Sequence, residues 1–135
     1  MKLLVLDDEL GIARLDATDP TPAWAAQGSL SSVTRTAEEL CIVCAAAAIP
    51  AGVQAVRGWR CLRVAGRLDF SLTGVLAAIA GPLAAANVSI FAVSTYDTDY
   101  VLVPGESLRA AMEALSASGH EVVSERDRRN FETTK

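Results

Sequence analysis

The sequence predicts an α+β fold in which antiparallel β-sheets carry helices on one face. The chain has 135 residues, of which 51% are hydrophobic, so it holds enough apolar material for one ordinary domain or two very small ones. From Trp59 onward, the spacing of the apolar residues changes between a period of two and a period of about 3.6 residues. Glycine and proline stand where the period changes, which predicts strands and helices separated by turns.

The first regular segment of this series is a strand over Arg60–Ala65. Leu62 and Val64 fall on one side of the strand and the arginines do not join them, which predicts one face toward solvent. Gly66 then ends the strand, because a glycine after an alternating run indicates a turn.

A helix is expected next, with Ser71 as its N-cap and Leu72 as its first apolar residue. The apolar residues keep helical spacing as far as Leu83. Gly81-Pro82 conflicts with this pattern, because a proline inside a helix removes a hydrogen bond and costs about 3 kcal/mol. We therefore expect a kink or an early end of the helix there.

The remaining segments complete a β-α-β-β-α-β order. Val88–Val93 and Tyr100–Val103 are rich in β-forming residues, and the short polar segment between them predicts an antiparallel hairpin. Glu106–Ser118 predicts a second amphipathic helix, and Glu121–Val123 predicts a closing strand. This order is that of the ferredoxin-like split βαβ unit, an antiparallel sheet with both helices on one face. Because the other face stays uncovered, we expect the unit to pair with a similar one.

The amino-terminal half predicts a second, strand-rich unit. Its segments with strand character are Lys2–Leu6, Gly11–Leu15, Leu30–Thr34 and Leu40–Cys44. This half is too short to be stable alone, so we expect residues 1–57 to form a degenerate ferredoxin-like unit packed on residues 58–124. Residues 125–135 are highly charged and are expected to form a disordered tail.

Charge and hydropathy exclude two classes of partner. The formal net charge is −4 and the calculated isoelectric point is near 4.9, which gives nucleic acid no basic face to bind. No apolar run is long enough to cross a bilayer, so no membrane partner is expected. The apolar run after Met1 is much shorter than the core of a signal peptide, which predicts the cytoplasm as the compartment.

The cysteines predict neither a disulfide framework nor a metal site. Cys41, Cys44 and Cys61 cannot all pair, and a chain with an apolar core of this size does not need cross-links. Cys41 and Cys44 have C-x-x-C spacing, but in a strand two residues three apart point to opposite faces. With His120 as the single histidine, no metal ion and no cofactor is expected.

Two polar segments are candidates for ligand binding. In residues 66–74, the N–H groups at the helix start could receive a carboxylate, whereas capping by Asp69 or Ser71 would explain the same residues without a ligand. In residues 94–99, Asp97 or Asp99 could pair with an ammonium group, although turn chemistry alone also explains such residues. If the two segments face one cleft, its natural ligand is a zwitterion.

The segments Leu68–Gly74 and Ser89–Val103 resemble ACT-domain proteins, namely the bacterial group related to the animal cytosolic arginine sensor and to aspartate-kinase regulatory domains. Ser94–Asp99 carries the most specific part of this resemblance, which extends over nearly the whole chain. The resemblance implies tandem ACT units with an amino acid held between them. The residues that it implies as ligand contacts are Gly66, Asp69, Thr95, Tyr96 and Asp99, together with backbone atoms of Cys41 and Ile42.

These features favour a non-catalytic regulatory or sensor module that binds an amino acid. Its partners would be that small ligand and either further copies of the chain or a regulated enzyme. The alternative is a structural oligomerisation module without a ligand. An enzyme is disfavoured, because acid–base catalysis needs a partner group with a shifted pKa and one histidine near a turn forms no recognisable triad.

Overall fold

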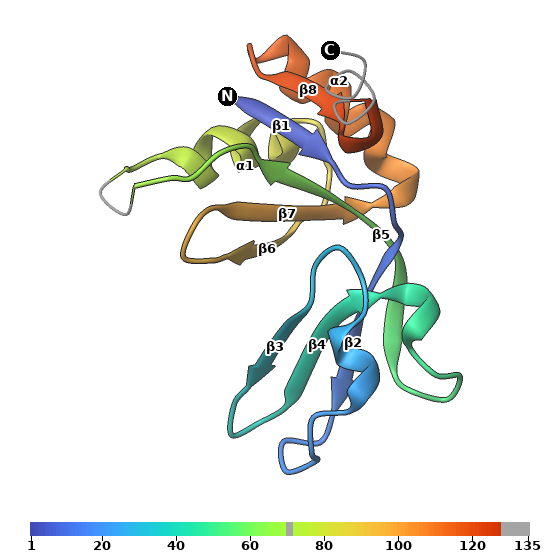
Figure 1. The fold of residues 1–135 in the computed structure, drawn as a ribbon. Coiled ribbons are helices and arrows are strands. Elements are labelled where there is room, and N and C mark those ends of the chain that lie inside the picture. Colours follow the sequence, from blue (N-terminus) through green and yellow to red (C-terminus); the bar gives the residue numbers. More distant parts are fainter. Residues whose placement is uncertain (70–71, 128–135) are drawn as a thin grey trace. The chain divides into compact units, whose positions relative to one another are not determined.

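The computed structural model describes residues 1–69 and 72–127 and divides the chain into two compact units (Figure 1). The N-terminal unit is Asp8–Trp59, and the C-terminal unit combines Met1–Asp7 with the residues from Arg60 onward. The observed division thus lies close to the expected one between residues 57 and 58, but the first strand belongs to the C-terminal unit. The tail expected over 125–135 lies, from residue 128, outside the described residues.

The C-terminal unit has the predicted ferredoxin-like order. Its elements are β5 (Ala55–Val64, second half), α1 (Val75–Ala85), β6 (Phe91–Ser94), β7 (Asp99–Pro104), the 3₁₀ turn η3 (Gly105–Ser107), α2 (Leu108–Ala117) and β8 (Glu121–Ser124), with β1 (Lys2–Val5) added from the start of the chain. The strand order is β6-β7-β5-β1-β8. This architecture confirms the predicted α+β class.

Strand β1 joins this sheet because it bonds with both of its neighbours there. Leu3 pairs with Val64 of β5 in the antiparallel sense and with Val122 of β8 in the parallel sense. The assignment of Lys2–Leu6 to the N-terminal unit was therefore wrong. A strand's own residues show that it is a strand, whereas its partners depend on distant segments.

Both helices pack on one face of the C-terminal sheet. The buried core on that face includes Leu3, Val5, Leu62, Val64, Ile79, Leu83, Val101, Val103, Ala111 and Leu115. Leu4, Cys61 and Leu102 alternate with these core residues along their strands and so lie on the opposite face of the sheet, where they are also fully buried, at 0% exposure. The expectation that Arg60–Ala65 turns one face to solvent was therefore wrong, and Cys61 is the residue that shows it.

The N-terminal unit repeats the same strand order with 3₁₀ turns in place of helices. Its elements are β2 (Leu10–Leu15), η1 (Ala23–Ala26), β3 (Ser32–Arg35), β4 (Leu40–Ala45), η2 (Ala46–Ala48) and the first half of β5. The order β3-β4-β2-β5 is antiparallel throughout. Strand for strand along the chain, it corresponds to the order β6-β7-β5-β8 that the C-terminal unit has when the added strand β1 is left out. Its core is formed by Ala13, Ala25, Leu40, Ile42, Cys44 and Ile49. A degenerate ferredoxin-like unit remains our proposal for this half.

Helix α1 starts three residues later than expected. Its N-cap is Gly74, whose φ of +77° is a left-handed conformation that glycine adopts more easily than other residues. The helix therefore begins after this glycine, and Leu72, which was expected to be its first apolar residue, precedes it and is 54% exposed. The expected N-cap Ser71 lies outside the described residues. The predicted strand Val88–Val93 also starts later, at Phe91. Among the described residues, no helix is long and apolar enough to span a bilayer.

Pro82 stays inside α1, which continues to Ala85 instead of ending early. A proline at this position cannot donate to the carbonyl of Ala78. The side chain of His120, which follows α2, replaces that donor: its Nε2 donates to the Ala78 carbonyl oxygen at 3.1 Å. Because a carbonyl only accepts, the proton lies on Nε2. His120 thus links the end of α2 to the middle of α1.

We predict an energetic coupling of about 1 kcal/mol between Pro82 and His120, the typical net value of one hydrogen bond. His120→Ala should destabilise the native protein, but less so in the Pro82→Ala background, where a backbone N–H at position 82 satisfies the Ala78 carbonyl. Urea unfolding of the two single variants and the double variant measures this coupling. Equal effects of His120→Ala in both backgrounds would contradict the proposed replacement.

A second prediction concerns Gly28, where the chain passes close to β4. Its φ is +114°, and a Cβ there would lie 2.7 Å from the backbone nitrogen of Ala45. Gly52 has a similar φ of +93° but nothing within 4 Å. Both glycine-to-alanine variants should lose about 1–3 kcal/mol through backbone strain. Gly28→Ala should lose about 1–3 kcal/mol more through overpacking. Denaturant unfolding compares the two, and equal losses would show that the close approach has no energetic weight.

Candidate ligand site

Two loops of the C-terminal unit are joined by their backbones. The N–H of Leu68, in the loop after β5, donates to the carbonyl oxygen of Asp97, in the turn between β6 and β7, at 2.6 Å. In the first loop, the N–H of Leu72 donates to the carbonyl of Asp69 at 3.0 Å. The described parts of the segments 66–74 and 94–99 therefore lie together, which is the condition under which the sequence favoured a zwitterionic ligand.

A cavity of about 200 Å³ lies where these loops meet, within the C-terminal unit. It is lined by Leu68, Asp69, Leu72, Val75, Ser94, Thr95, Tyr96, Thr98 and Asp99. The lining therefore combines an aliphatic wall from the first loop and the start of α1 with hydroxyl and carboxylate groups, a combination typical of small-molecule sites.

Hydroxyl groups hold the β6–β7 turn in place. The N–H and Oγ1 of Thr95 both donate to the Thr98 carbonyl oxygen, at 2.8 and 3.0 Å. The Oγ1 of Thr98, whose residue is only 5% exposed, donates to the Val64 carbonyl oxygen at 2.8 Å. This bond fixes the turn to the end of β5. Sequence reasoning missed Thr98, because a threonine in a polar turn carries no signal of burial.

The two acids of the turn have different surroundings. Arg67 Nε lies 3.0 Å from Asp97 Oδ1, and its guanidinium carbon lies 5.7 Å from the centre of the Tyr96 ring. The Arg67 and Asp97 side chains are 72% and 62% exposed, so this ion pair contributes at most about 1 kcal/mol. Asp97 is thus engaged outside the cavity lining, whereas Asp99 is part of it.

The N-terminal end of α1 borders the same cavity through Val75. The N-cap Gly74 has no side chain to accept from the first helical N–H groups, and its carbonyl accepts from Ala78 at 2.9 Å. The first N–H groups of a helix lack intrahelical partners and carry partial positive charge. This helix end can therefore receive an anionic group.

The structure brings together four of the residues proposed as ligand contacts: Asp69, Thr95, Tyr96 and Asp99. Gly66 does not line the cavity; it has φ +87°, which allows the turn that leaves β5.

Cys41 and Ile42 lie in β4 of the N-terminal unit. Ile42 is 0% exposed in the core, and both residues pair with β2 on one side and β3 on the other. Their backbone groups are therefore less free for a ligand than the resemblance implies. Their contact with a ligand remains a prediction.

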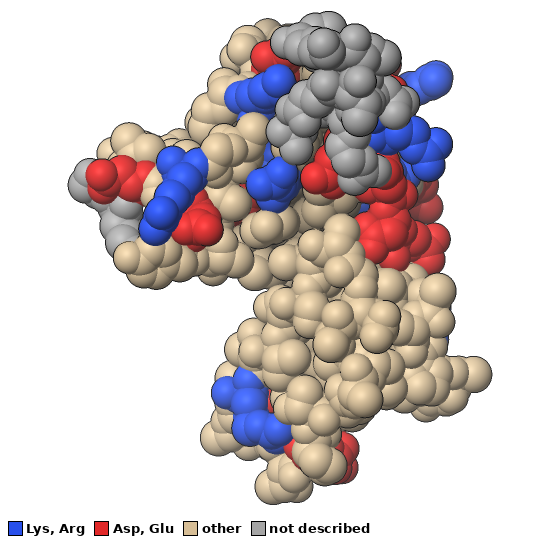
Figure 2. Space-filling view, viewed as in Figure 1, with Lys and Arg blue, Asp and Glu red and all other residues tan. Residues whose placement is uncertain are grey.

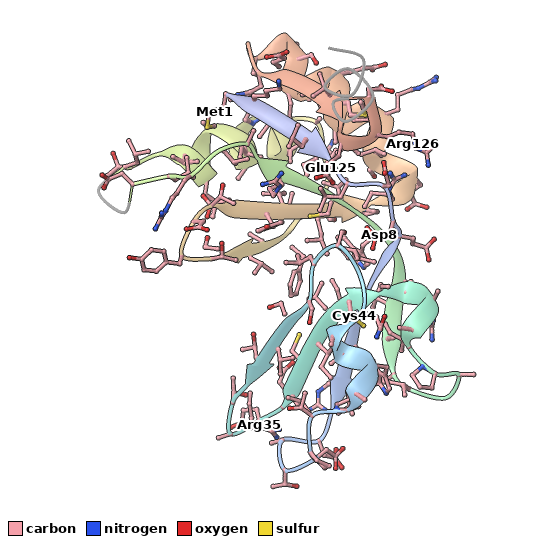
Figure 3. The ribbon with its side chains drawn as sticks, in the orientation of Figure 1. Met1, Asp8, Arg35, Cys44, Glu125 and Arg126 are labelled. Atoms are coloured by element: carbon pink, nitrogen blue, oxygen red, sulfur yellow. The ribbon has the colours of Figure 1, made fainter. Side chains whose placement is uncertain are left out.

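Cys41 and Cys44 point to opposite faces of β4, as the spacing predicts. Cys44 belongs to the buried core of the N-terminal unit (Figure 3), and Cys41 is half-buried on the other face. Burial raises the pKa of both thiols; Glu39 raises that of Cys41 further, and Arg57 partly opposes the rise at Cys44. Within residues 1–69 and 72–127, no group of three or more His, Cys, Asp or Glu side chains is placed to hold a metal ion.

Figure 2 shows how the charged side chains are distributed on one face of the chain. On the face drawn in Figure 2, the described lysines and arginines are interspersed with acids and do not merge into one broad basic area. The formal net charge is −4. The absence of a nucleic-acid partner stays a prediction from the sequence.

We predict that Thr98→Val destabilises the C-terminal unit by about 1–3 kcal/mol, because it removes a buried hydrogen bond without changing the side-chain volume much. Thr98→Ser keeps the hydroxyl and should retain that bond, losing only a methyl group. Chemical denaturation followed by the far-ultraviolet circular dichroism of helices α1 and α2, both of which lie in the C-terminal unit, measures both variants. If the serine variant lost as much as the valine variant, the hydroxyl would not be the stabilising group.

Comparison with known sequences and structures gives consistent relatives. A family model described as an ACT domain matches residues 54–117, and a second model, described as an N-terminal domain, matches residues 8–52. The human and bovine proteins named cytosolic arginine sensor for mTORC1 subunit 1 are 43% identical to the chain over 58 residues. That match covers 42% of the chain and 18% of each sensor, so the chain spans less than a fifth of their length.

Solved structures extend the likeness to almost the whole chain. A crystal structure of an Agrobacterium tumefaciens protein superposes with a TM-score of 0.87 at 40% identity, covering 92% of both chains. The regulatory subunit of aspartate kinase from Thermus thermophilus has a TM-score of 0.59 at 14% identity, covering 83% of this chain and 93% of that one. At that identity, the second likeness shows the shared fold alone.

Proposed function

Because the chain belongs to the ACT-domain proteins, we propose that it is a regulatory module that binds a free amino acid in the cavity of its C-terminal unit. The curated relatives are named as arginine sensors, and the family model describes an ACT domain, which supports a regulatory role. The finer parts of the proposal, the ligand class and the residues that bind it, rest on the geometry of the cavity. The relatives' name describes them as cytosolic, and we propose the cytoplasm for this chain too.

The charges around the cavity suit a zwitterion. Asp99 can accept hydrogen bonds from an ammonium group, and charge-assisted bonds of this kind are stronger than neutral ones. The start of α1 at Val75 can receive the carboxylate. The single observation that carries the proposal is that one cavity is bordered both by the carboxylate of Asp99 and by the N-terminal end of helix α1.

The size of the cavity favours a small metabolite. Its volume of about 200 Å³ lies below the range of about 300–1,000 Å³ that is typical of pockets for drug-sized ligands. Leu68, Leu72 and Val75 offer the aliphatic wall on which the ligand's carbon chain would lie. Asp69 is a second carboxylate in the lining, and the lining residues that the structure describes include no basic side chain. A cationic amino acid is therefore the first ligand to test, and arginine, which the relatives are named for, is the natural choice.

A structural oligomerisation module remains the second candidate. It is favoured by β3, an edge strand whose residues Val33, Thr34 and Arg35 are exposed, since an uncovered edge can pair with another strand. This candidate needs no ligand and predicts that assembly is independent of the cavity.

We predict that arginine or another amino acid stabilises the wild-type chain, by about 2.7 kcal/mol at about 100 times its dissociation constant. Asp99→Asn should abolish this stabilisation, because the neutral amide cannot balance an ammonium charge. Asp97→Asn is the matched control: it lies in the same turn but outside the cavity lining, and should keep the response. Thermal shift and isothermal titration measure both.

The opposite outcomes are equally clear. No stabilisation by any standard amino acid, or equal losses in Asp97→Asn and Asp99→Asn, would argue against this cavity as the ligand site. An assembly state that is unchanged by every variant, combined with a flat titration, would favour the oligomerisation module.

A further inference from the structure

A second cavity, of about 350 Å³, lies in the N-terminal unit. The neighbouring strands β2, β4 and β5 each contribute two residues of one face, which lie in the strand or directly before it. These residues are Ile12 and Arg14, Glu39 and Cys41, and Gln54 and Val56. We call this cavity the sheet-face groove. Its volume lies within the range of about 300–1,000 Å³ that is usual for small-molecule sites.

Strand register explains why these side chains share one face. Arg14 pairs with Cys41, and Ile12 pairs with Val56, so the members of each pair point the same way. Residues one position away point to the opposite face, where Ala13 and Ile42 belong to the core. The groove therefore lies on the face of the sheet that turns away from this core.

The groove holds two opposite charges that do not neutralise each other. Arg14 Nη2 donates to the backbone carbonyl of Glu38 at 3.0 Å, and the described residues show no ion pair between Arg14 and Glu39. Glu39 directly precedes β4 and lies two residues along the chain from Cys41, the partner of Arg14, so the two charged residues are diagonal neighbours and do not face each other directly. Ile12 is half-buried and Val56 is 59% exposed, which gives the groove an apolar floor.

We propose that the sheet-face groove is a second binding site, which takes a zwitterionic small molecule with an apolar side chain, such as a neutral aliphatic amino acid. The guanidinium of Arg14 and the amide of Gln54 bind the carboxylate, since a guanidinium has five donors and, among the described residues, one of them is seen to donate, to the Glu38 carbonyl. Glu39 accepts from the ammonium group. Ile12 and Val56 contact the aliphatic side chain. This proposal does not depend on the ligand of the C-terminal cavity.

Cys41 supplies a reporter for this groove. It is half-buried, whereas Cys44 and Cys61 are each 0% exposed, so a thiol reagent should modify Cys41 first in the folded full-length chain. A molecule bound in the groove covers Cys41 and should slow that reaction. Slowing should reach about tenfold with the amino acid at about ten times its dissociation constant.

The experiment measures the modification rate with and without leucine, and with two analogues that each lack one charge, leucinamide and 4-methylpentanoate. Leucine should protect more strongly than either analogue. Glu39→Gln should remove the protection, whereas the neighbouring Glu38→Gln should keep it, because only the backbone of Glu38 contacts Arg14. Each variant is compared with itself without leucine, since removing the Glu39 charge also changes the basal reactivity of Cys41.

Asp99→Asn separates this proposal from the function proposed above. Protection of Cys41 by leucine should persist in Asp99→Asn even though the response of the C-terminal cavity is lost. Three outcomes would overturn the second site: no protection by leucine, equal protection in wild type and Glu39→Gln, or protection that Asp99→Asn abolishes. Protection that instead rises with protein concentration in the absence of leucine would assign the groove to a second copy of the chain and overturn the small-molecule proposal.

Discussion

Strand β5 is the constraint on which both units depend. Its ten residues, Ala55–Val64, provide the fourth strand of the N-terminal sheet with their first half and the first strand of the C-terminal sheet with their second half. Each half must therefore present its side chains in the register of a different sheet. In the second half, Cys61 is fully buried on one face and Leu62 and Val64 are almost fully buried on the other.

The C-terminal cavity is positioned by backbone and buried groups instead of by its charged side chains. The Leu68–Asp97 backbone bond and the Thr98 hydroxyl fix the two loops to each other and to the end of β5. The exposed Arg67–Asp97 ion pair adds little by comparison. A cavity held in this way keeps its shape without relying on the charged side chains that line it, which is what preorganised recognition would require.

The C-terminal unit was largely predictable from sequence because its elements follow one another locally. The hairpin of β6 and β7 and the second helix are set by short-range patterns and turn residues. The start of α1 was not, since a left-handed Gly74 interrupts an apolar pattern that otherwise extends to Leu72. For the candidate site, the two polar segments were identified, but Thr98 was missed and Gly66 lies outside the lining. Neither error could be corrected from the sequence, because both depend on which backbone groups form hydrogen bonds with the residues of each turn.

The position of β1 sets the order in which the chain can acquire its structure. Lys2 lies beside Glu121 and Val5 beside Ser124, so nearly the whole chain separates two strands that are in contact. Contacts between such distant segments slow folding, because the entropy of closing a long loop is lost before the contact forms. During synthesis, β1 leaves the ribosome well before β8, so the edge of β1 that pairs with β8 stays open to other strands until β8 has been made.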